Sequence, residues 1–130
     1  MLLVKTRTGP SKIHGTGLFA DEFIPKDTRV WEFSSLVDKA YSKKEVEELP
    51  EPERSDVLSL YHTWINKRSG KYIVEGDNGR FANHSFTPNL IQTKEGFIAS
   101  RDIAKGEELT YDYQEFSSEG TNFEFEPGVI

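Results

Sequence analysis

The spacing of apolar and polar residues divides the chain into three regions. In the first, residues 1–37, short apolar or β-branched runs alternate with turn-forming residues, a pattern typical of strands. We expect strands over residues 2–7, 17–20 and 28–33. The first third of the chain is therefore predicted to be a set of short strands joined by turns.

The second region, residues 38–60, has a helical pattern. Ser42 and Glu45 have the spacing of a capping box, in which the serine side chain accepts from the amide of Glu45 and the glutamate reaches back. Pro50 is expected to end this helix. Pro52 suits the first turn of a second short helix that runs toward Leu60. We expect a helical insert over about residues 38–60.

The third region, residues 61–113, returns to short strands, expected over residues 71–75, 89–93, 97–100 and 108–111. Turn-forming residues lie between them at 68–70, 76–79, 94–96 and 104–106. Many short strands with one helical insert predict a mostly β architecture rather than a doubly wound α/β sheet. Because no βαβ unit with a glycine-rich turn is visible, an adenosine-type cofactor would have to be held in another way.

Composition narrows the possible functions. A chain of 130 residues with 35% hydrophobic residues is enough for one compact domain. The absence of cysteine excludes a disulfide framework, a thiolate zinc site and a cysteine nucleophile, and only three histidines argue against a dedicated metal site. A formal net charge of -6 argues against direct nucleic-acid binding through a basic face.

Charge is uneven along the chain. No Lys or Arg follows Lys105, while seven acidic residues do. This acidic end is either a solvated tail or a surface that attracts a basic partner. The apolar run at the N-terminus is too short for a signal peptide or a membrane span, and no later segment approaches that length. We expect an intracellular protein, cytoplasmic or, in a eukaryote, nuclear.

Three motifs could carry chemistry. In residues 12–20, Gly15 and Gly17 allow either an ordinary tight turn or a close backbone approach to a ligand. In residues 79–89, several Asn, His, Ser and Thr side chains form either a polar loop or a binding site. In residues 103–113, Tyr111 and Tyr113 point to the same face of a strand, as core rings or as two phenols in a pocket.

In this order the motifs resemble those of the SET-domain family, which consists mainly of protein-lysine methyltransferases. The resemblance rests on Gly-Thr-Gly-Leu-Phe-Ala at 15–20, Arg-Phe-Ala-Asn-His-Ser at 80–85 with Pro-Asn at 88–89, and Gly-Glu-Glu-Leu-Thr-Tyr-Asp-Tyr at 106–113. It implies a SET-type β-clip fold of small twisted sheets with a C-terminal pseudoknot. The SET domain would span residues 1–113, and the acidic, Phe-containing tail 114–130 would pack on it.

The resemblance also implies a reaction and a site. The reaction is S-adenosylmethionine-dependent methyl transfer to a lysine side-chain amine of a protein substrate. Tyr113 falls at the family's essential tyrosine, and Tyr111 falls at a position that affects how many methyl groups are added. The tyrosine at that position favours monomethylation. The cofactor residues implied are Gly15, Thr16, Gly17, Leu18, Phe19, Arg80, Phe81, Asn83 and His84, and the substrate channel would include Tyr61, Tyr111 and Phe116.

The chain departs from the family pattern in places. Phe86 stands where many members have Cys, Asp27 occupies a turn position where Gly is common, and the cysteine-rich flanking segments of many members are absent. Phe116, Phe123 and Phe125 are the aromatic candidates for closing the lysine channel, or they simply pack on the sheet.

The acidic end favours a basic protein as substrate, and so small a domain could share its channel with a second copy in a homo-oligomer. The alternatives are a non-catalytic SET-like module that binds a peptide or cofactor, and a β-rich interaction domain that binds no cofactor.

Overall fold

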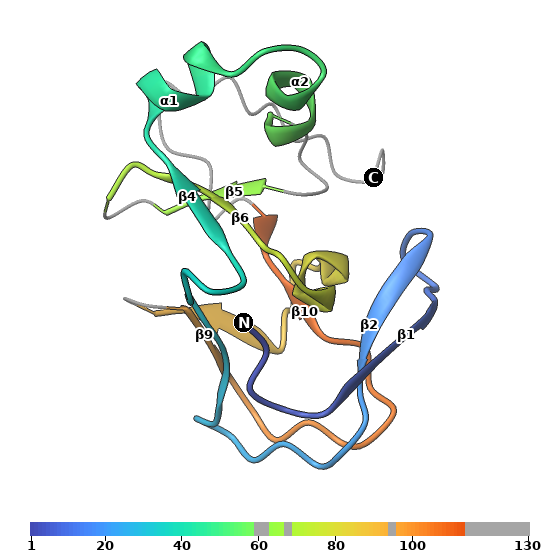
Figure 1. The fold of residues 1–130 in the computed structure, drawn as a ribbon. Helices are drawn as coiled ribbons and strands as arrows, with labels where there is room; N and C mark the ends of the chain where they lie inside the picture. The colour runs from blue at the N-terminus through green and yellow to red at the C-terminus, as the bar shows by residue number, and fades with distance from the viewer. Residues whose placement is uncertain (59–62, 67–68, 94–95, 114–130) are drawn as a thin grey trace.

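The computed structural model describes residues 1–58, 63–66, 69–93 and 96–113 (Figure 1). Short strands dominate these residues, with two short α-helices and one 3-10 helix. The elements in order are β1 (Thr6–Pro10), β2 (Thr16–Ala20), β3 (Arg29–Glu32), β4 (Lys39–Tyr41), α1 (Lys43–Glu48), α2 (Glu53–Val57), β5 (Thr63–Ile65), β6 (Tyr72–Val74), η1 (Asn78–Phe81), β7 (Asn83–His84), β8 (Leu90–Gln92), β9 (Gly96–Ala99) and β10 (Thr110–Tyr111). The predicted mostly β fold with a short helical insert is confirmed.

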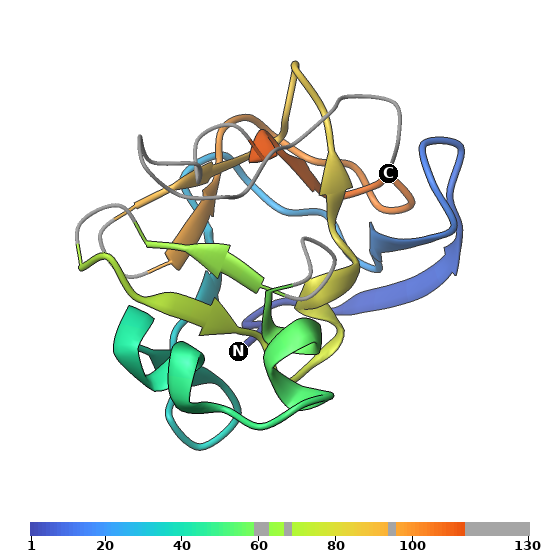
Figure 2. The same cartoon turned by 90° about the horizontal axis from the view of Figure 1, so that it is seen from above.

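The strands form several small sheets rather than one large one. The hairpin β1–β2 stands at one side of the molecule, and α1 and α2 lie beyond the sheet β4–β6–β5 (Figures 1 and 2). A third sheet has the order β3–β9–β8. All of these pairs are antiparallel, whereas β7 and β10 pair in parallel. That parallel pair brings the second and third sequence motifs together.

The helical insert is shorter than predicted. The capping box of Ser42 and Glu45 is present in both directions, and α1 ends at Glu48, before Pro50. However, residues 39–41 form strand β4, which pairs with β6, so the prediction of helix from residue 38 was wrong there. The cause is tertiary, because β4 satisfies its backbone groups by pairing with a strand more than 30 residues further along the chain. None of the described helices is long and apolar enough to span a membrane.

Other boundaries also shifted. Strand β1 begins at Thr6 rather than Leu2, which instead makes an isolated bridge to Trp31. Strands β5 and β7 had no counterpart in the prediction, and part of the expected turn at 76–79 belongs to η1, which Asp77 caps through the amide of Gly79. Asp27 adopts a left-handed conformation with φ of 69°, which explains why glycine suits that turn position.

Aromatic rings fill the centre of the core. The rings of Trp31, Trp64 and Phe97 meet edge-on with centroids 5.3 to 5.9 Å apart, a favourable arrangement for aromatic quadrupoles. Phe97 also packs against Tyr111 at 5.4 Å, and Tyr111 against Tyr113 at 4.7 Å. The two tyrosines of the third motif are thus the end of a continuous aromatic row that begins in the core.

Candidate functional site

The site forms where β7 and β10 lie side by side. Thr110 pairs with Asn83 and Tyr111 with His84, and the amide of Ser85 donates to the carbonyl of Tyr111 at 3.0 Å. This pairing joins two segments that are far apart in the sequence. It brings together four of the predicted site residues, the Asn-His pair and the two tyrosines.

The two phenols are buried and hydrogen-bonded. Tyr111 and Tyr113 are each only 8% exposed. The hydroxyl of Tyr113 donates to the carbonyl oxygen of Ala82 at 2.9 Å. Burial raises the pKa of Tyr111 well above its ordinary value, and the neighbouring Tyr113, the charge of Glu75 and a hydrogen bond to the Tyr113 side chain add to this. Tyr111 therefore stays protonated near neutral pH.

Counting protons gives the direction of the hydrogen bond between the phenols. A carbonyl oxygen can only accept, so the single proton of Tyr113 is used on Ala82. The hydrogen bond between the two tyrosine side chains must then be donated by Tyr111. The phenol of Tyr111 is therefore the donor within this pair.

His84 is neutral and fixed in one tautomer. Its Nδ1 accepts from the backbone amide of Tyr113 at 3.1 Å, which requires Nδ1 to carry no proton. Burial lowers the pKa of His84, and the charge of Asp112 works against that shift. Asp112 lies 3.7 Å from Nδ1, but no ion pair forms while the imidazole is neutral. The ring of Phe86 covers His84 edge-on at 4.3 Å.

Asn83 connects this pair of strands to the glycine turn. The side chain lies among oxygen acceptors, with Nδ2 at 3.0 Å from the carbonyl of His14, 3.0 Å from Glu108 Oε2 and 3.1 Å from Ser11 Oγ. The carbonyl of Thr16 lies at 3.4 Å. Because carbonyl and carboxylate oxygens only accept, the NH2 group must be the one that faces the turn.

The glycine turn is shaped for close approach at two positions. Gly15 adopts φ of 45°, and a side chain at Gly17 would meet Glu108 Oε2 at 2.6 Å. Leu18, in contrast, is 1% exposed and packs in the core. Phe19 lies under the guanidinium of Arg7 at 4.8 Å. The backbone of Gly15, Thr16 and Gly17 lies near Asn83, whereas the side chain of Leu18 points away from the site.

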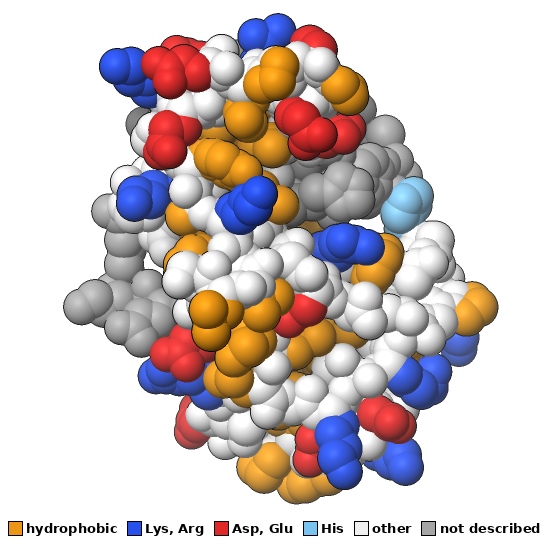
Figure 3. Space-filling view, in the orientation of Figure 1, with side chains coloured by type: hydrophobic (Ala, Val, Ile, Leu, Met, Phe, Trp, Pro, Cys, Tyr) orange, Lys and Arg blue, Asp and Glu red, His pale blue; other side chains and the backbone are white. Residues whose placement is uncertain are grey.

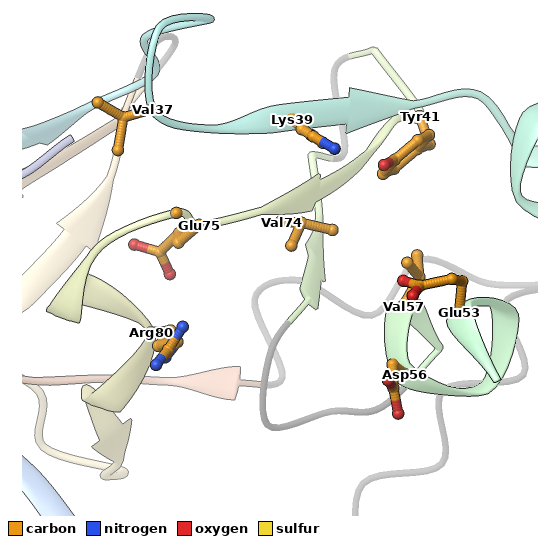
Figure 4. A pocket seen from close by; sticks show the side chains of 10 residues that line it. Val37, Lys39, Tyr41, Glu53, Asp56, Val57, Val74, Glu75 and Arg80 are labelled. Carbon is orange, nitrogen blue, oxygen red and sulfur yellow. The ribbon is translucent and has the colours of Figure 1, made fainter.

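The side chain of Arg80 lines a pocket that is separate from the Asn83 and His84 site. Its guanidinium stacks over Phe81 at 4.9 Å, and it lines a pocket of about 440 Å³ between β4, β6 and α2. Figure 4 shows Arg80 and Glu75 at one side of this pocket and the acidic side chains of α2 at the other. None of the remaining predicted cofactor residues lines it.

Glu75 is a buried carboxyl that the sequence did not single out. It is 7% exposed, and burial raises its pKa to about 8, with further raising by the charges of Asp77 and Asp38 and an opposing effect of the N-terminal ammonium. Its charge also acts on Tyr111. Glu75 therefore lines the pocket and, when charged, also raises the pKa of Tyr111.

Two predicted residues lie outside the described part of the chain, and three groups at the site were not predicted. Tyr61 and Phe116, predicted for the substrate channel, lie outside the described residues. The sequence reasoning missed Ser11, the carbonyl of Ala82 and the carboxylate of Glu108. Glu108 lies inside the third motif, so its position was available as a signal, whereas a backbone carbonyl leaves no trace in residue type. On the face seen in Figure 3, the surface over α1 and α2 carries acidic and basic side chains interspersed.

The described residues suit a ligand with an amino-acid end. The hydrogen bonds of the Asn83 side chain to described residues all come from Nδ2, and none reaches Oδ1. The residue as a whole is only 5% exposed. An acceptor held in this way fits an ammonium group. Open space lies beside Gly15, where an added side chain would meet nothing within 4 Å, whereas the space beside Gly17 is filled by Glu108. These features fit S-adenosylmethionine, which carries such a group.

Comparisons with known proteins match this chain to one family. The family model described as SET domain matches residues 15–114. The H3 lysine-36 specific histone-lysine N-methyltransferase of Schizosaccharomyces pombe is 34% identical over 76% of this chain and 13% of its own length. Histone-lysine N-methyltransferase 2D of Homo sapiens is 32% identical over 80% of this chain and 2% of its own length.

A solved structure agrees with the fold. Apo ctPRC2 with mutations in Ezh2 has a TM-score of 0.68 and 25% identity, covering 89% of this chain and 16% of that chain. The chain therefore spans only a small part of the length of the proteins it matches.

Proposed function

Because the chain belongs to the SET domain family, we propose that it transfers a methyl group from S-adenosylmethionine to the side-chain amine of lysine in a protein. The observation that carries this proposal is the oxygen cluster of Tyr111, Tyr113 and Ala82 beside Asn83 and His84. It offers acceptors for an amine on one side and for an amino-acid end on the other. On the side of the amino-acid end, the backbone carbonyl of His14 in the glycine turn lies beside Asn83.

The role proposed for the phenols is to orient the amine. Methyl transfer to an amine is a direct displacement, so the nitrogen must lie in line with the methyl group at near-attack distance. The hydroxyl of Tyr111 donates to Tyr113, and a phenolic oxygen can also accept, so we propose that it accepts an N–H of the amine. Tyr113, held by Ala82, would be the fixed member of the pair. Two hydrogen-bonded phenols at the end of an aromatic row make a rigid orienting surface.

No residue in this cluster is a general base. A lysine amine has an ordinary pKa of about 10.4 and must be neutral to react. The raised pKa of Tyr111 excludes a phenolate near neutral pH. Burial of the amine among aromatic side chains disfavours its charged form, so the ammonium would lose its proton to water on entry. The site therefore favours the neutral amine by its environment rather than by proton abstraction.

The residues proposed to hold the methyl donor are Gly15, Thr16, Gly17, Asn83 and His84. S-adenosylmethionine, when bound, supplies a methyl group activated by a sulfonium. Asn83 Oδ1 would accept from its ammonium, and the neutral ring of His84, covered by Phe86, would lie against the adenosine part. Leu18 would support the turn from the core, and Arg80 would contribute only through the separate pocket that it lines.

The degree of methylation and the substrate class are part of the proposal. Tyr111 carries a hydroxyl that fills space beside the amine, which favours monomethylation. The relatives are named for histone lysines, so a lysine in a basic protein is the substrate class we propose. They include enzymes named for H3 lysine-36 and for H3 lysine-4, so the target lysine does not follow from the family.

The decisive experiment combines binding and transfer. Calorimetry with S-adenosylhomocysteine should show saturable binding, and incubation with labelled S-adenosylmethionine and an array of basic peptides should give monomethyl-lysine by mass spectrometry. Binding without transfer to any peptide or lysate protein would favour the non-catalytic module. No binding of either compound at millimolar concentration would contradict the proposal.

A further inference from the structure

We infer that Glu108, acting with Ser11, is a positioning residue that selects the amino-acid end of the methyl donor by fixing the Asn83 amide; this rests on the function proposed above. Glu108 is not among the residues that the family motifs assign to the cofactor in this chain. Its carboxylate does not need to touch the ligand. It acts through the orientation and the local charge that it gives to Asn83.

The contacts define which polar atoms of Ser11, Glu108 and Asn83 donate hydrogen bonds and which accept them. Ser11 Oγ lies 2.8 and 2.9 Å from the two oxygens of Glu108 and donates its only proton there. The same hydroxyl accepts from Asn83 Nδ2 at 3.1 Å and from the amide of Ile13 at 2.9 Å. Glu108 Oε2 accepts directly from Asn83 Nδ2 at 3.0 Å. Glu108 and Ser11, which are hydrogen-bonded to each other, therefore clamp the NH2 group of Asn83 with two adjacent oxygens.

This clamp decides which atom of Asn83 faces a ligand. With NH2 held by the carboxylate, the serine and the carbonyl of His14, a flipped amide would place oxygen against oxygen at each of these contacts. Asn83 Oδ1 is therefore directed to the opposite side. Without the Glu108 carboxylate, NH2 would be held only by Ser11 and the carbonyls of His14 and Thr16, so the amide would be less firmly oriented. A turned amide would present NH2 to the ligand and repel an ammonium.

The surroundings of the Glu108 carboxylate differ from those of the adjacent Glu107. Among the described residues no Lys or Arg lies within 4 Å of its carboxylate, and its hydrogen bonds come from neutral groups. The adjacent Glu107 is different, because it pairs with Arg101 at 3.1 Å and accepts from the amide of Ala104 at 3.0 Å. A lone carboxylate held beside the glycine turn favours a cation there.

The backbone of Glu108 is held independently of its side chain. Its carbonyl accepts from Asn89 Nδ2 at 2.8 Å, and the next amide, of Leu109, donates to Leu18 at 2.7 Å. Residue 108 also bridges Phe19. A change of the carboxylate to an amide should therefore leave the strand in place, so Glu108→Gln is a local test.

The test compares two ligands by calorimetry on the whole chain. S-adenosylhomocysteine has the amino-acid end, and 5′-methylthioadenosine lacks it. In Glu108→Gln, the Kd for S-adenosylhomocysteine should rise at least about tenfold, since hydrogen bonds to charged groups contribute on this scale, while the Kd for 5′-methylthioadenosine should change less than about twofold. Ser11→Ala should show the same selectivity, and the double variant should be little weaker than Glu108→Gln because both act on one amide. Glu107→Gln is the matched control and should bind both ligands as the parent does.

Each outcome has a distinct meaning. Unchanged binding of S-adenosylhomocysteine by Glu108→Gln would overturn the inference, and so would equal weakening of both ligands, which is the result of a purely structural role. If Glu108→Gln does not fold, as judged by thermal unfolding, Ser11→Ala decides by the same criterion. If the parent chain binds neither ligand, the proposed function itself fails. If the parent binds and the variants show no selectivity, only the role of Glu108 fails.

Discussion

The phenolic oxygen of Tyr113 lies 2.9 Å from the carbonyl oxygen of Ala82, the residue directly before Asn83. This hydrogen bond joins the last residue of the third motif to the middle of the second. It also fixes the polarity of the phenol pair, because the one proton of Tyr113 is used on the carbonyl. This buried hydrogen bond therefore adds to the β7–β10 pairing in joining the two halves of the proposed site.

Replacing Tyr113 by Phe tests the orienting role. The variant loses the hydroxyl that holds Ala82 and Tyr111, while the ring can still pack against Tyr111 and His84. We expect the methylation rate to fall by about 10²-fold or more, in the range of other positioned catalytic groups. The Kd for S-adenosylhomocysteine should change little. Full activity on an identified peptide, measured with labelled S-adenosylmethionine, would contradict the mechanism.

Replacing Tyr111 by Phe tests the control of product. The change removes the oxygen that would accept an N–H of the amine and leaves space for a methyl group. Mass spectrometry should show a shift from monomethyl-lysine toward dimethyl- and trimethyl-lysine. The parallel variant Tyr72→Phe, on β6 within a different apolar cluster, is a control that should keep the parent product. Ready trimethylation by the parent, with no change in Tyr111→Phe, would refute this role.

Protonation of His84 should lower the free energy of unfolding as pH falls. Burial lowers the folded-state pKa of His84 below its ordinary value of 6.5, so the unfolded chain takes up a proton first as pH falls. Stability from this residue is therefore complete above about pH 6.5 and declines as pH falls through the folded pKa. Protonation of Nδ1 also breaks the hydrogen bond from the Tyr113 amide.

The variant His84→Asn keeps an acceptor but does not titrate. Its unfolding midpoint, followed from pH 7 to pH 5, should therefore fall less steeply than that of the parent. Parallel curves of unfolding midpoint against pH for the two proteins would show that His84 does not contribute to the loss of stability at low pH.

Glu75 should destabilise the fold at higher pH. Its pKa is raised from 4.5 to about 8, so between these values the folded protein holds a proton that the unfolded chain has released. Stability from this group is therefore highest below pH 4.5 and falls as pH rises, by up to about 1.4 kcal/mol per unit for a single proton. Above about pH 8 the decline from Glu75 should end.

Glu75→Gln keeps the shape of the side chain and removes the charge. We expect this variant to be more stable than the parent at pH 8 and to have a flatter stability profile between pH 5 and pH 8. Chemical denaturation at a series of pH values measures both. A steeper profile in the variant would mean that the carboxylate has a partner that stabilises its charged form.

The elements with local signals were the ones that could be predicted from the sequence. The capping box of Ser42 and Glu45 acts within four residues, so its pattern identified α1 correctly. Strand β4 lacks a local signal, because its extended form depends on pairing with β6. The same is true of β7, a pair of residues that is a strand only because β10 lies beside it.

For the candidate site, the order of the motifs identified the family, and the family match confirms that identification. The roles of the individual site residues remain predictions. Residue types could not reveal the contact of Ser11 with Glu108, which joins side chains 97 positions apart. Nor could they reveal that Leu18 faces the core while its neighbours face the turn. Both follow from the way the hairpin β1–β2 docks against the end of the chain described here.

The aromatic row has an optical consequence. The chain has two tryptophans, Trp31 and Trp64, and both lie in the ring cluster that continues through Phe97 to Tyr111. Indole emission is sensitive to the packing and polarity around the ring. Ring contacts therefore connect Tyr111 of the candidate site to both tryptophans. We expect ligand binding at the site to change tryptophan emission, so that binding can be followed without a label.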